Sequence, residues 1–437
     1  MSARREALSV LTACRVRGAW ADAALGPRLA GLAPADAGLC SRIVYGVIQN
    51  EALLDFYLSR YCTQKLERLQ PPLADILRIG AYQILFLDRV PDSAAVHTSV
   101  ELAKGAGRGP AAGLVNAVLR RLSREKDALP DLPAEDRAEY LALRYSHPLW
   151  LTRRLIALLG DEEAEAYLRL DNAAVPTVIQ RNPLRCTAGE LTESLREDGV
   201  SLTPHSWLPD CWQISGGGSP EDMPAFRQGW FQVQDAAARA AVLAAGLKPG
   251  DRVLDVCAAP GGKSFAAAMA MEDRGEIVAC DIHRHKLELI EKGAERLGLQ
   301  CVRPALADGR ETREEWREGF DAVLCDVPCS GLGIIRKKPD VRYKDPALLA
   351  GLPAVQRAIL DNARRYVKPG GVLLYATCTI LPEENQDVTE DFLSRRDEFR
   401  REGFSLPGGK EAEDGSLTLW PQRHGTDGFY ICRMRRS

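Results

Sequence analysis

Two cysteines stand where a nucleophile would be useful: Cys329 in "CDVPCSGLG" and Cys378 in "YATCTILPEEN". Each follows a short apolar run and lies next to glycines or capping residues, so we expect both thiols where a strand gives way to a loop. A thiolate is a strong nucleophile, so an enzyme that used a cysteine nucleophile could use either of these two thiols. Their spacing of forty-nine residues does not show which one attacks.

A glycine-rich stretch, "CAAPGGK", covers residues 257–263. Gly261 and Gly262 would let the backbone pass close to a ligand and would open a helix whose N-terminus favours carboxylates or phosphates. A P-loop would need glycine in place of Cys257, and the G-x-G-x-x-G pattern of nicotinamide and flavin sites is absent. A nucleoside ligand without phosphates remains, and S-adenosylmethionine fits.

Three aspartates follow apolar runs in the same half of the chain. Asp281 lies nineteen residues after Gly262, the right distance for a carboxylate that accepts both ribose hydroxyls. The alternative for Asp281 is an exposed strand-end or helix-capping aspartate. Asp308 lies in "ADGR", which is also an ordinary turn sequence, and Asp326 begins the "DVPC" loop. No C-x-x-C pair occurs, so we expect no metal site.

These residues all follow elements of one predicted sheet, because from about residue 225 apolar strands alternate with helices. Such a pattern predicts a parallel sheet covered on both faces, whose strand ends form the ligand crevice. The terminal "GFYICRMRR" is expected to add an edge strand. The five predicted strands are 253–258, 277–280, 302–307, 322–325 and 372–376.

The rest of the chain has a different pattern. Residues 1–130 are predicted to be helical. The segment "GLVNAVLRRLSRE" carries an apolar stripe with helical spacing, and a further helix is expected to be capped near Ser93. This part of the chain contains 17 Lys and Arg against 12 Asp and Glu. "KDALPDLPAED" is a linker candidate, and "TVIQRNPLR" predicts a strand that ends at Asn182. We therefore expect three domains: 1–130, a small α+β domain over 140–222, and a catalytic domain over 225–437.

The composition, 46% hydrophobic and 27% charged, is that of a globular protein, and no apolar run approaches a membrane span. The N-terminus lacks a signal-peptide core, so we expect a cytoplasmic protein that binds no membrane. In that compartment most of the twelve cysteines would be reduced, and those within strands would be core filler.

Taken together, "LDVCAAPGGK", "CDVPCSGLG", "YATCT" and "GWFQVQDAAARAAV" resemble the RNA cytosine-5 methyltransferases. The helical N-terminus, with "YGVIQN" and "GLVNAVLRRL", resembles the NusB-type RNA-binding domain that is fused to this catalytic unit in the RsmB/Sun (Fmu) family. That family usually has serine where this chain has Thr379. The resemblance implies a Rossmann-like S-adenosylmethionine-dependent methyltransferase domain, preceded by an all-α NusB-like domain and a small linking domain. It also implies methylation of small-subunit ribosomal RNA by a chain that we expect to be a monomer and not to bind DNA.

The resemblance also assigns roles to single residues. Cys378 would attack cytosine C6 and Cys329 would serve product release, whereas the Pro-Cys of DNA cytosine methyltransferases would make Cys329 the nucleophile. Asp326 would hold the cytosine edge beside the cofactor, oriented by Lys263. Asp281 would bind the ribose and Asp308 the adenine side. The backbone around the methionine part would come from Cys257, Ala258, Ala259, Pro260, Gly261, Gly262 and Lys263.

Three further hypotheses stay open. The basic tract "IIRKKPDVRYK" is either a solvated charge run or an RNA-phosphate contact at the mouth of the crevice. The substrate could be transfer RNA instead of ribosomal RNA. The chain could also be a non-catalytic RNA-binding or antitermination factor built on its helical domain, which the intact motifs at five strand ends disfavour.

Overall fold

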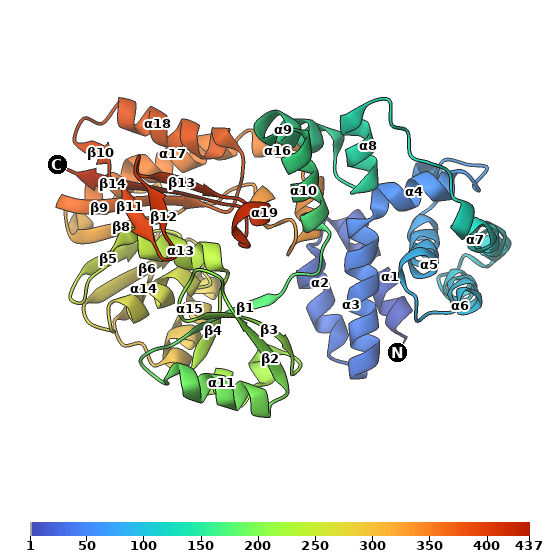
Figure 1. Ribbon diagram of the computed structural model, residues 1–437, viewed down its shortest axis with the longest axis horizontal. Helices are drawn as coiled ribbons and strands as arrows, with labels where there is room; N and C mark the ends of the chain where they lie inside the picture. Colours follow the sequence, from blue (N-terminus) through green and yellow to red (C-terminus); the bar gives the residue numbers. More distant parts are fainter. Residues whose placement is uncertain (1) are drawn as a thin grey trace. The chain divides into compact units, whose positions relative to one another are not determined.

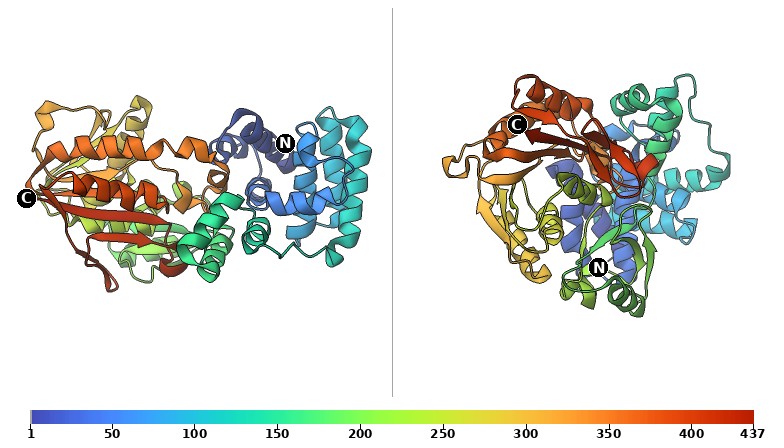
Figure 2. Two further views of the ribbon diagram at one scale, coloured as in Figure 1. Left: turned by 90° about the horizontal axis from the view of Figure 1, so that it is seen from above. Right: turned by 60° about the vertical axis from the view of Figure 1, so that its left-hand side comes forward.

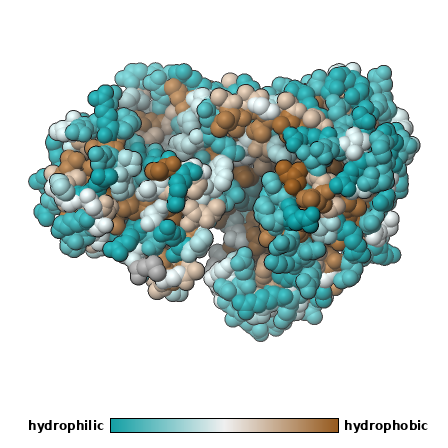
Figure 3. Space-filling model, turned by 180° about the vertical axis from the view of Figure 1, so that it is seen from behind, coloured by the Kyte–Doolittle hydropathy of each residue, from teal (hydrophilic) through white to brown (hydrophobic). Residues whose placement is uncertain are grey.

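A computed structural model describes residues 2–437, which form two compact units. The first unit comprises residues up to Ala173 together with Ile335–Lys344, and the second comprises Ala174–Ile334 and Asp345–Ser437. Figure 1 traces the chain through both, from the blue helices to the red strands. Within the described residues, no helix is long and apolar enough to cross a membrane. On the face seen in Figure 3, hydrophobic residues are scattered among hydrophilic ones.

The first unit is helical, as predicted. In α7 the predicted stripe is confirmed, because Val115, Leu119 and Leu122 are fully buried against the other helices. The predicted Ser93 cap is wrong: α6 begins at Asp92, one residue earlier, and no side chain caps it. The helices are α1 (Ala3–Arg17), α2 (Ala21–Leu29), α3 (Pro34–Gln49), α4 (Glu51–Ser59), α5 (Leu73–Phe86), α6 (Asp92–Gly105), α7 (Ala112–Glu125), α8 (Arg137–Arg144), α9 (Leu149–Leu159) and α10 (Asp161–Asp171).

A small antiparallel sheet opens the second unit, with strand order β2-β3-β1-β4. The predicted strand of "TVIQRNPLR" is confirmed as β1, which ends directly before Asn182. Helix α11 covers the sheet and begins with a capping box between Thr187 and Glu190. The elements are β1 (Thr177–Arg181), α11 (Ala188–Glu197), β2 (Val200–Pro204), β3 (Cys211–Gly216), α12 (Pro224–Arg227) and β4 (Phe231–Val233).

The larger sheet has the strand order β10-β14-β9-β8-β5-β6-β7, with β13 also paired to β14. The five predicted strands are present as β5 to β9 and pair in parallel. The strands are β5 (Arg252–Asp255), β6 (Glu276–Asp281), β7 (Val302–Leu306), β8 (Phe320–Asp326), β9 (Val367–Thr377), β10 (Phe399–Arg401), β13 (Ser416–Leu419) and β14 (Phe429–Arg436); a separate pair is formed by β11 (Phe404–Leu406) and β12 (Lys410–Ala412).

The terminal strand β14 is not an edge strand, contrary to the prediction. It runs antiparallel to β9 on one side, and β10 and β13 pair with its other side. Over Phe429–Cys432 its backbone pairs with β13 and, from Tyr430, with β9, so this part of the strand presents no open edge. The strand therefore lies inside the sheet.

Alternate residues of the parallel strands enter two different cores. Ile277, Leu324 and Leu374 face one core, whereas Val278 and Cys325 face the other. Helices α13 (Ala236–Ala245), α14 (Gly262–Ala270) and α15 (Arg284–Leu297) pack on the first face, and α17 (Leu352–Ala363) and α18 (Gln386–Ser394) pack on the second; α16 (Pro346–Leu349) and α19 (Pro421–His424) are short. Figures 1 and 2 show these layers from three sides. Cys280 and Cys325 are core filler, as predicted.

The basic tract that follows the Cys329 loop belongs to the helical unit. Arg342 is completely buried there, and its guanidinium donates to the carbonyl oxygens of Tyr145 and Ser146 at 3.2 and 3.1 Å and to Oδ1 of Asn172 at 2.8 Å. Lys338 forms an ion pair of 2.8 Å with Asp22. A phosphate contact by Arg342 is therefore excluded, because its charge has no access to solvent.

Replacing Arg342 should therefore destabilise the protein without touching the strand-end residues. For Arg342→Ala we expect a loss of about 3 kcal/mol, because buried carbonyl oxygens lose a charged donor. For Lys338→Ala we expect a loss of less than about 1 kcal/mol, because its ion pair with Asp22 is exposed. Urea unfolding of both variants measures the difference, and equal losses would contradict the anchoring role of Arg342.

Candidate active site

The predicted site residues lie at one edge of the larger sheet. Strands β5 to β9 are parallel, so the loops at their carboxyl ends meet at the same edge. The chain leaves β5 in one direction for β6 and β7, and the adjacent β8 leads in the other direction to β9. This reversal beside β5 is where ligands bind in sheets of this class.

The loop after β5 is shaped by its glycines. Gly261 has a φ of +111°, and a Cβ there would lie 2.3 Å from the ring of Phe265, so no larger residue fits without displacement. Gly262 begins α14, and its carbonyl oxygen accepts a hydrogen bond of 2.8 Å from Nε2 of Gln234. Gln234 belongs to the "GWFQVQD" motif, which the sequence analysis used without giving it a role. This hydrogen bond from the motif helps to hold the backbone of the glycine loop in place.

The two predicted cofactor aspartates have different surroundings. Asp281 is 9% exposed, and its Oδ1 accepts a hydrogen bond of 2.9 Å from the backbone nitrogen of His283. Its other oxygen lies 3.9 Å from Nζ of Lys286. Asp308 is bound by Arg310 at 2.6 Å, and this hydrogen bond lowers the pKa of the Asp308 carboxyl. One oxygen of Asp281 is thus available to a ligand, whereas a ligand that binds Asp308 would have to share its carboxylate with Arg310.

Two apolar side chains beside these aspartates were missed from the sequence. Ile282 is 53% exposed and Leu306, which pairs with Asp281 in the sheet, is 40% exposed. Exposed aliphatic groups at a ligand edge suit the flat face of an aromatic ring. The available signal was the apolar residue directly after Asp281.

Lys263 and Asp326 form a contact that the sequence analysis expected. Nζ of Lys263 lies 2.6 Å from Oδ2 of Asp326, and both side chains are largely buried. Burial would lower the pKa of Lys263, but the charge of the Asp326 carboxylate and the hydrogen bond to it raise the pKa above the usual lysine value. The lysine therefore stays charged, orients the carboxylate and lies within electrostatic range of Cys378.

The side chains of Cys329 and Cys378 are in contact. Their Sγ atoms are 3.2 Å apart, which is hydrogen-bonding distance for a thiol and a thiolate. The pKa of Cys329 is raised well above its usual value by the hydrogen bond to Cys378 and by burial. Cys329 thus keeps its proton at neutral pH. Burial also raises the pKa of Cys257, so that thiol is no candidate nucleophile.

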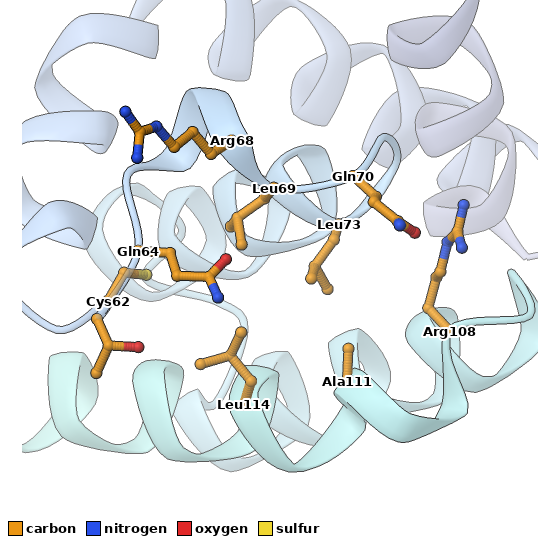
Figure 4. A pocket seen from close by; sticks show the side chains of 10 residues that line it. Cys62, Gln64, Arg68, Leu69, Gln70, Leu73, Arg108, Ala111 and Leu114 are labelled. Carbon is orange, nitrogen blue, oxygen red and sulfur yellow. The ribbon is translucent and has the colours of Figure 1, made fainter.

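A separate pocket of about 360 Å³ lies in the helical unit (Figure 4). Arg68 and Arg108 line it together with Gln64 and Gln70. Within residues 2–437, neither guanidinium has a carboxylate partner, and Figure 4 shows Arg68 and Arg108 at opposite ends of the pocket. No sequence motif marks this pocket, because its residues come from separate turns of the chain.

Comparison with known proteins agrees with this arrangement. Residues 242–435 match the 16S rRNA methyltransferase RsmB/F family model, residues 1–124 the NusB family, and residues 147–219 the ferredoxin-like domain of RsmF/B-like methyltransferases. The "Probable ribosomal RNA small subunit methyltransferase B" of Bacillus subtilis is 35% identical over 92% of this chain and 90% of its own length. The "Ribosomal RNA small subunit methyltransferase B" of Vibrio cholerae is 33% identical over 92% and 90%. The crystal structure of PH0851 has a TM-score of 0.84 at 26% identity, covering 99% of this chain and 98% of that one.

The fold and the strand-end residues define a Rossmann-like methyltransferase domain that is preceded in the chain by a NusB-type helical domain, as predicted. The chain belongs to the RsmB/F family of methyltransferases and is therefore an enzyme. The cofactor of such an enzyme is S-adenosylmethionine, again as predicted, and the residues fit it: a glycine cradle, and an aspartate with one oxygen available.

We expect Asp281→Asn to weaken S-adenosylmethionine binding by about 1.5–3 kcal/mol, because the ribose hydroxyls lose a charged acceptor. The amide oxygen can still accept from the nitrogen of His283, so the entry to α15 should stay intact. Calorimetric titration measures the affinity, and Glu288→Ala, an exposed change on the same helix, is the control. Unchanged affinity in Asp281→Asn would remove Asp281 from the cofactor site.

Proposed function

We propose that this chain is a cytoplasmic, monomeric enzyme that methylates C5 of a cytosine in small-subunit ribosomal RNA through a covalent cysteine intermediate. The observation that carries the proposal is the 3.2 Å approach of two thiols beside a lysine-bound carboxylate. A site for methyl transfer to a nitrogen or oxygen needs no thiol, whereas carbon-5 of cytosine has to be activated first.

The chemistry explains the thiol. Cytosine C5 is a poor nucleophile, and addition of a thiolate at C6 converts the ring into an enamine whose electron pair lies at C5. Bound S-adenosylmethionine supplies an electrophilic methyl group at this site. After C5 has taken the methyl group, a base removes the C5 proton, the ring double bond re-forms, and the bond from sulfur to C6 breaks. Covalent catalysis thus divides one difficult step into easier ones.

The surroundings of the two thiols favour Cys378 for the attack. Cys378 directly follows β9, whereas the pKa of Cys329 is raised well above its usual value by the hydrogen bond to Cys378 and by burial, so Cys329 is the poorer nucleophile. Cys329 keeps its proton and lies against the same sulfur, so it can donate that proton to the Cys378 sulfur as the bond from sulfur to C6 breaks. Asp326, which Lys263 orients through a hydrogen bond of 2.6 Å, would accept from the exocyclic amino group of the cytosine.

The RNA substrate is supported by the relatives, which are named for small-subunit ribosomal RNA. A base in a duplex cannot reach two recessed thiols, so the target nucleotide has to be unstacked or flipped out. We further propose that residues 1–130 bind RNA, that residues 140–222 form a linking domain, and that residues 225–437 catalyse methyl transfer. The pocket of Arg68 and Arg108 would hold a backbone phosphate. Transfer RNA remains the competing substrate, and labelled methyl transfer to each purified RNA separates the two.

The thiol roles have distinct signatures. Cys378→Ala should bind cofactor but yield neither methylated RNA nor a covalent RNA complex. Cys329→Ala should still attack and methylate but release slowly, because its release partner is gone. It should accumulate a protein–RNA adduct that survives denaturing electrophoresis.

The double variant is the control and should form no adduct. If adducts disappear in Cys329→Ala and persist in Cys378→Ala, the roles are reversed and the assignment above is wrong.

The helical pocket can be tested by charge. We expect Arg68→Gln combined with Arg108→Gln to weaken RNA binding by about tenfold at low salt, because two phosphate contacts are lost, and to leave cofactor affinity unchanged. The matched control is Arg17→Gln combined with Arg89→Gln, two exposed arginines outside the pocket. Equal weakening by both pairs in a filter-binding assay would show a general charge effect and no site.

A further inference from the structure

One buried carboxylate touches both thiol loops. Glu384 is 1% exposed, and its Oε2 accepts a hydrogen bond of 2.8 Å from the backbone nitrogen of Ser330, the residue directly after Cys329. Its Oε1 lies 3.4 Å from Oγ1 of Thr379, the residue directly after Cys378. A single side chain therefore spans the two loops at the positions next to the sulfur atoms.

Further contacts tie the same two loops together. The hydroxyl groups of Ser330 and Thr379 are 2.6 Å apart. Gln356 on α17 donates from its Nε2 to Oε2 of Glu384 at 2.8 Å and to the carbonyl oxygen of Pro328 at 3.0 Å. Glu384 is thus the centre of a small polar network that is closed off from solvent.

The two loops depend on this network to different degrees. Cys378 directly follows β9, and Asn385 also holds the carbonyl oxygen of Thr379 at 3.0 Å. The Cys329 loop has left β8, and its contacts to this network run through Glu384, Gln356 and the Ser330 hydroxyl. Loss of the Glu384 bridge should therefore displace Cys329 more than Cys378.

The carboxyl group of Glu384 has no basic partner within the described residues. Among residues 2–437, no lysine or arginine forms an ion pair with it, and every hydrogen bond that it makes comes from a neutral donor. A buried carboxylate without a cation is costly. Its presence between the two loops thus points to a task in the site and not to a stabilising ion pair.

We propose that Glu384 is a positioning residue for the two-thiol reaction, holding the Cys329 loop at the sulfur–sulfur separation that the release step requires. The inference rests on the proposed function. It assigns to Glu384 no contact with substrate or cofactor. Its effect is transmitted through Ser330 and Thr379, so its removal should slow release of the RNA more than attack.

Two conservative variants separate position from charge. Glu384→Gln keeps the length of the side chain, and its oxygen can accept from Ser330 while its amide donates to Thr379. Glu384→Asp keeps the charge but is one methylene shorter and cannot reach both loops. If position matters, breakdown of the covalent RNA adduct should slow by about tenfold or more in Glu384→Asp, and the adduct should accumulate, whereas Glu384→Gln stays near the wild-type rate.

The experiment is single-turnover methylation of ribosomal RNA by the full chain, with the adduct followed on denaturing gels. Asp387→Ala, an exposed change on α18, is the matched control, and calorimetric cofactor binding verifies folding of each variant. Slow breakdown in Glu384→Gln with normal breakdown in Glu384→Asp would show that charge matters and would overturn the proposal. Normal breakdown in both would overturn it as well.

Failure of the proposed function gives a different result. If Cys329→Ala forms no adduct on the same gel, the assignment of the release step to Cys329 is wrong whatever Glu384 does. If Cys329→Ala accumulates the adduct and Glu384→Asp does not, only the role of Glu384 is wrong.

Discussion

The approach of two sulfur atoms to 3.2 Å is the constraint on which the site depends. Cys329 and Cys378 are far apart in the chain, and only the parallel pairing of β8 with β9 brings their loops to the same edge of the sheet. Asp326 pairs with Ala376 in that register, so both loops begin at the same level. A shift of one residue would turn the following side chains to the other face. The register of β8 with β9 therefore determines that the two cysteine loops begin at the same level of the sheet.

The Cys329 loop connects the larger sheet to a segment of the helical unit. It leaves β8 on one side, and on the other side the chain continues into Ile335–Lys344, which belongs to the helical unit through the buried Arg342. An arginine in "KKPDVRYK" would usually be assigned to solvent or RNA. Its burial among carbonyl oxygens instead shows that the helical unit takes part in holding the stretch that follows the catalytic loop.

Much of this was predictable, because strand ends carry strong local signals. Apolar runs followed by glycine, aspartate or cysteine located the five parallel strands, and a glycine loop that fits neither the P-loop nor the G-x-G-x-x-G pattern pointed to S-adenosylmethionine. What the sequence could not give depends on distant partners. The internal position of β14, the burial of Arg342 and the bridge by Glu384 arise from residues that are far apart in the chain or from pairing in the sheet. For Asp308 the sequence could not show that Arg310 already occupies the carboxylate.

The central claim is that Cys378 forms the bond to the cytosine ring. RNA that carries 5-fluorocytidine tests it directly, because carbon-5 then has no proton to lose and the adduct cannot resolve. After incubation of the wild-type chain with this RNA and S-adenosylmethionine, protease digestion and mass spectrometry identify the peptide that is linked to the nucleotide. The account predicts a nucleotide on the peptide that contains Cys378. A nucleotide on the peptide that contains Cys329, or no adduct from an enzyme that methylates ordinary RNA, would contradict it.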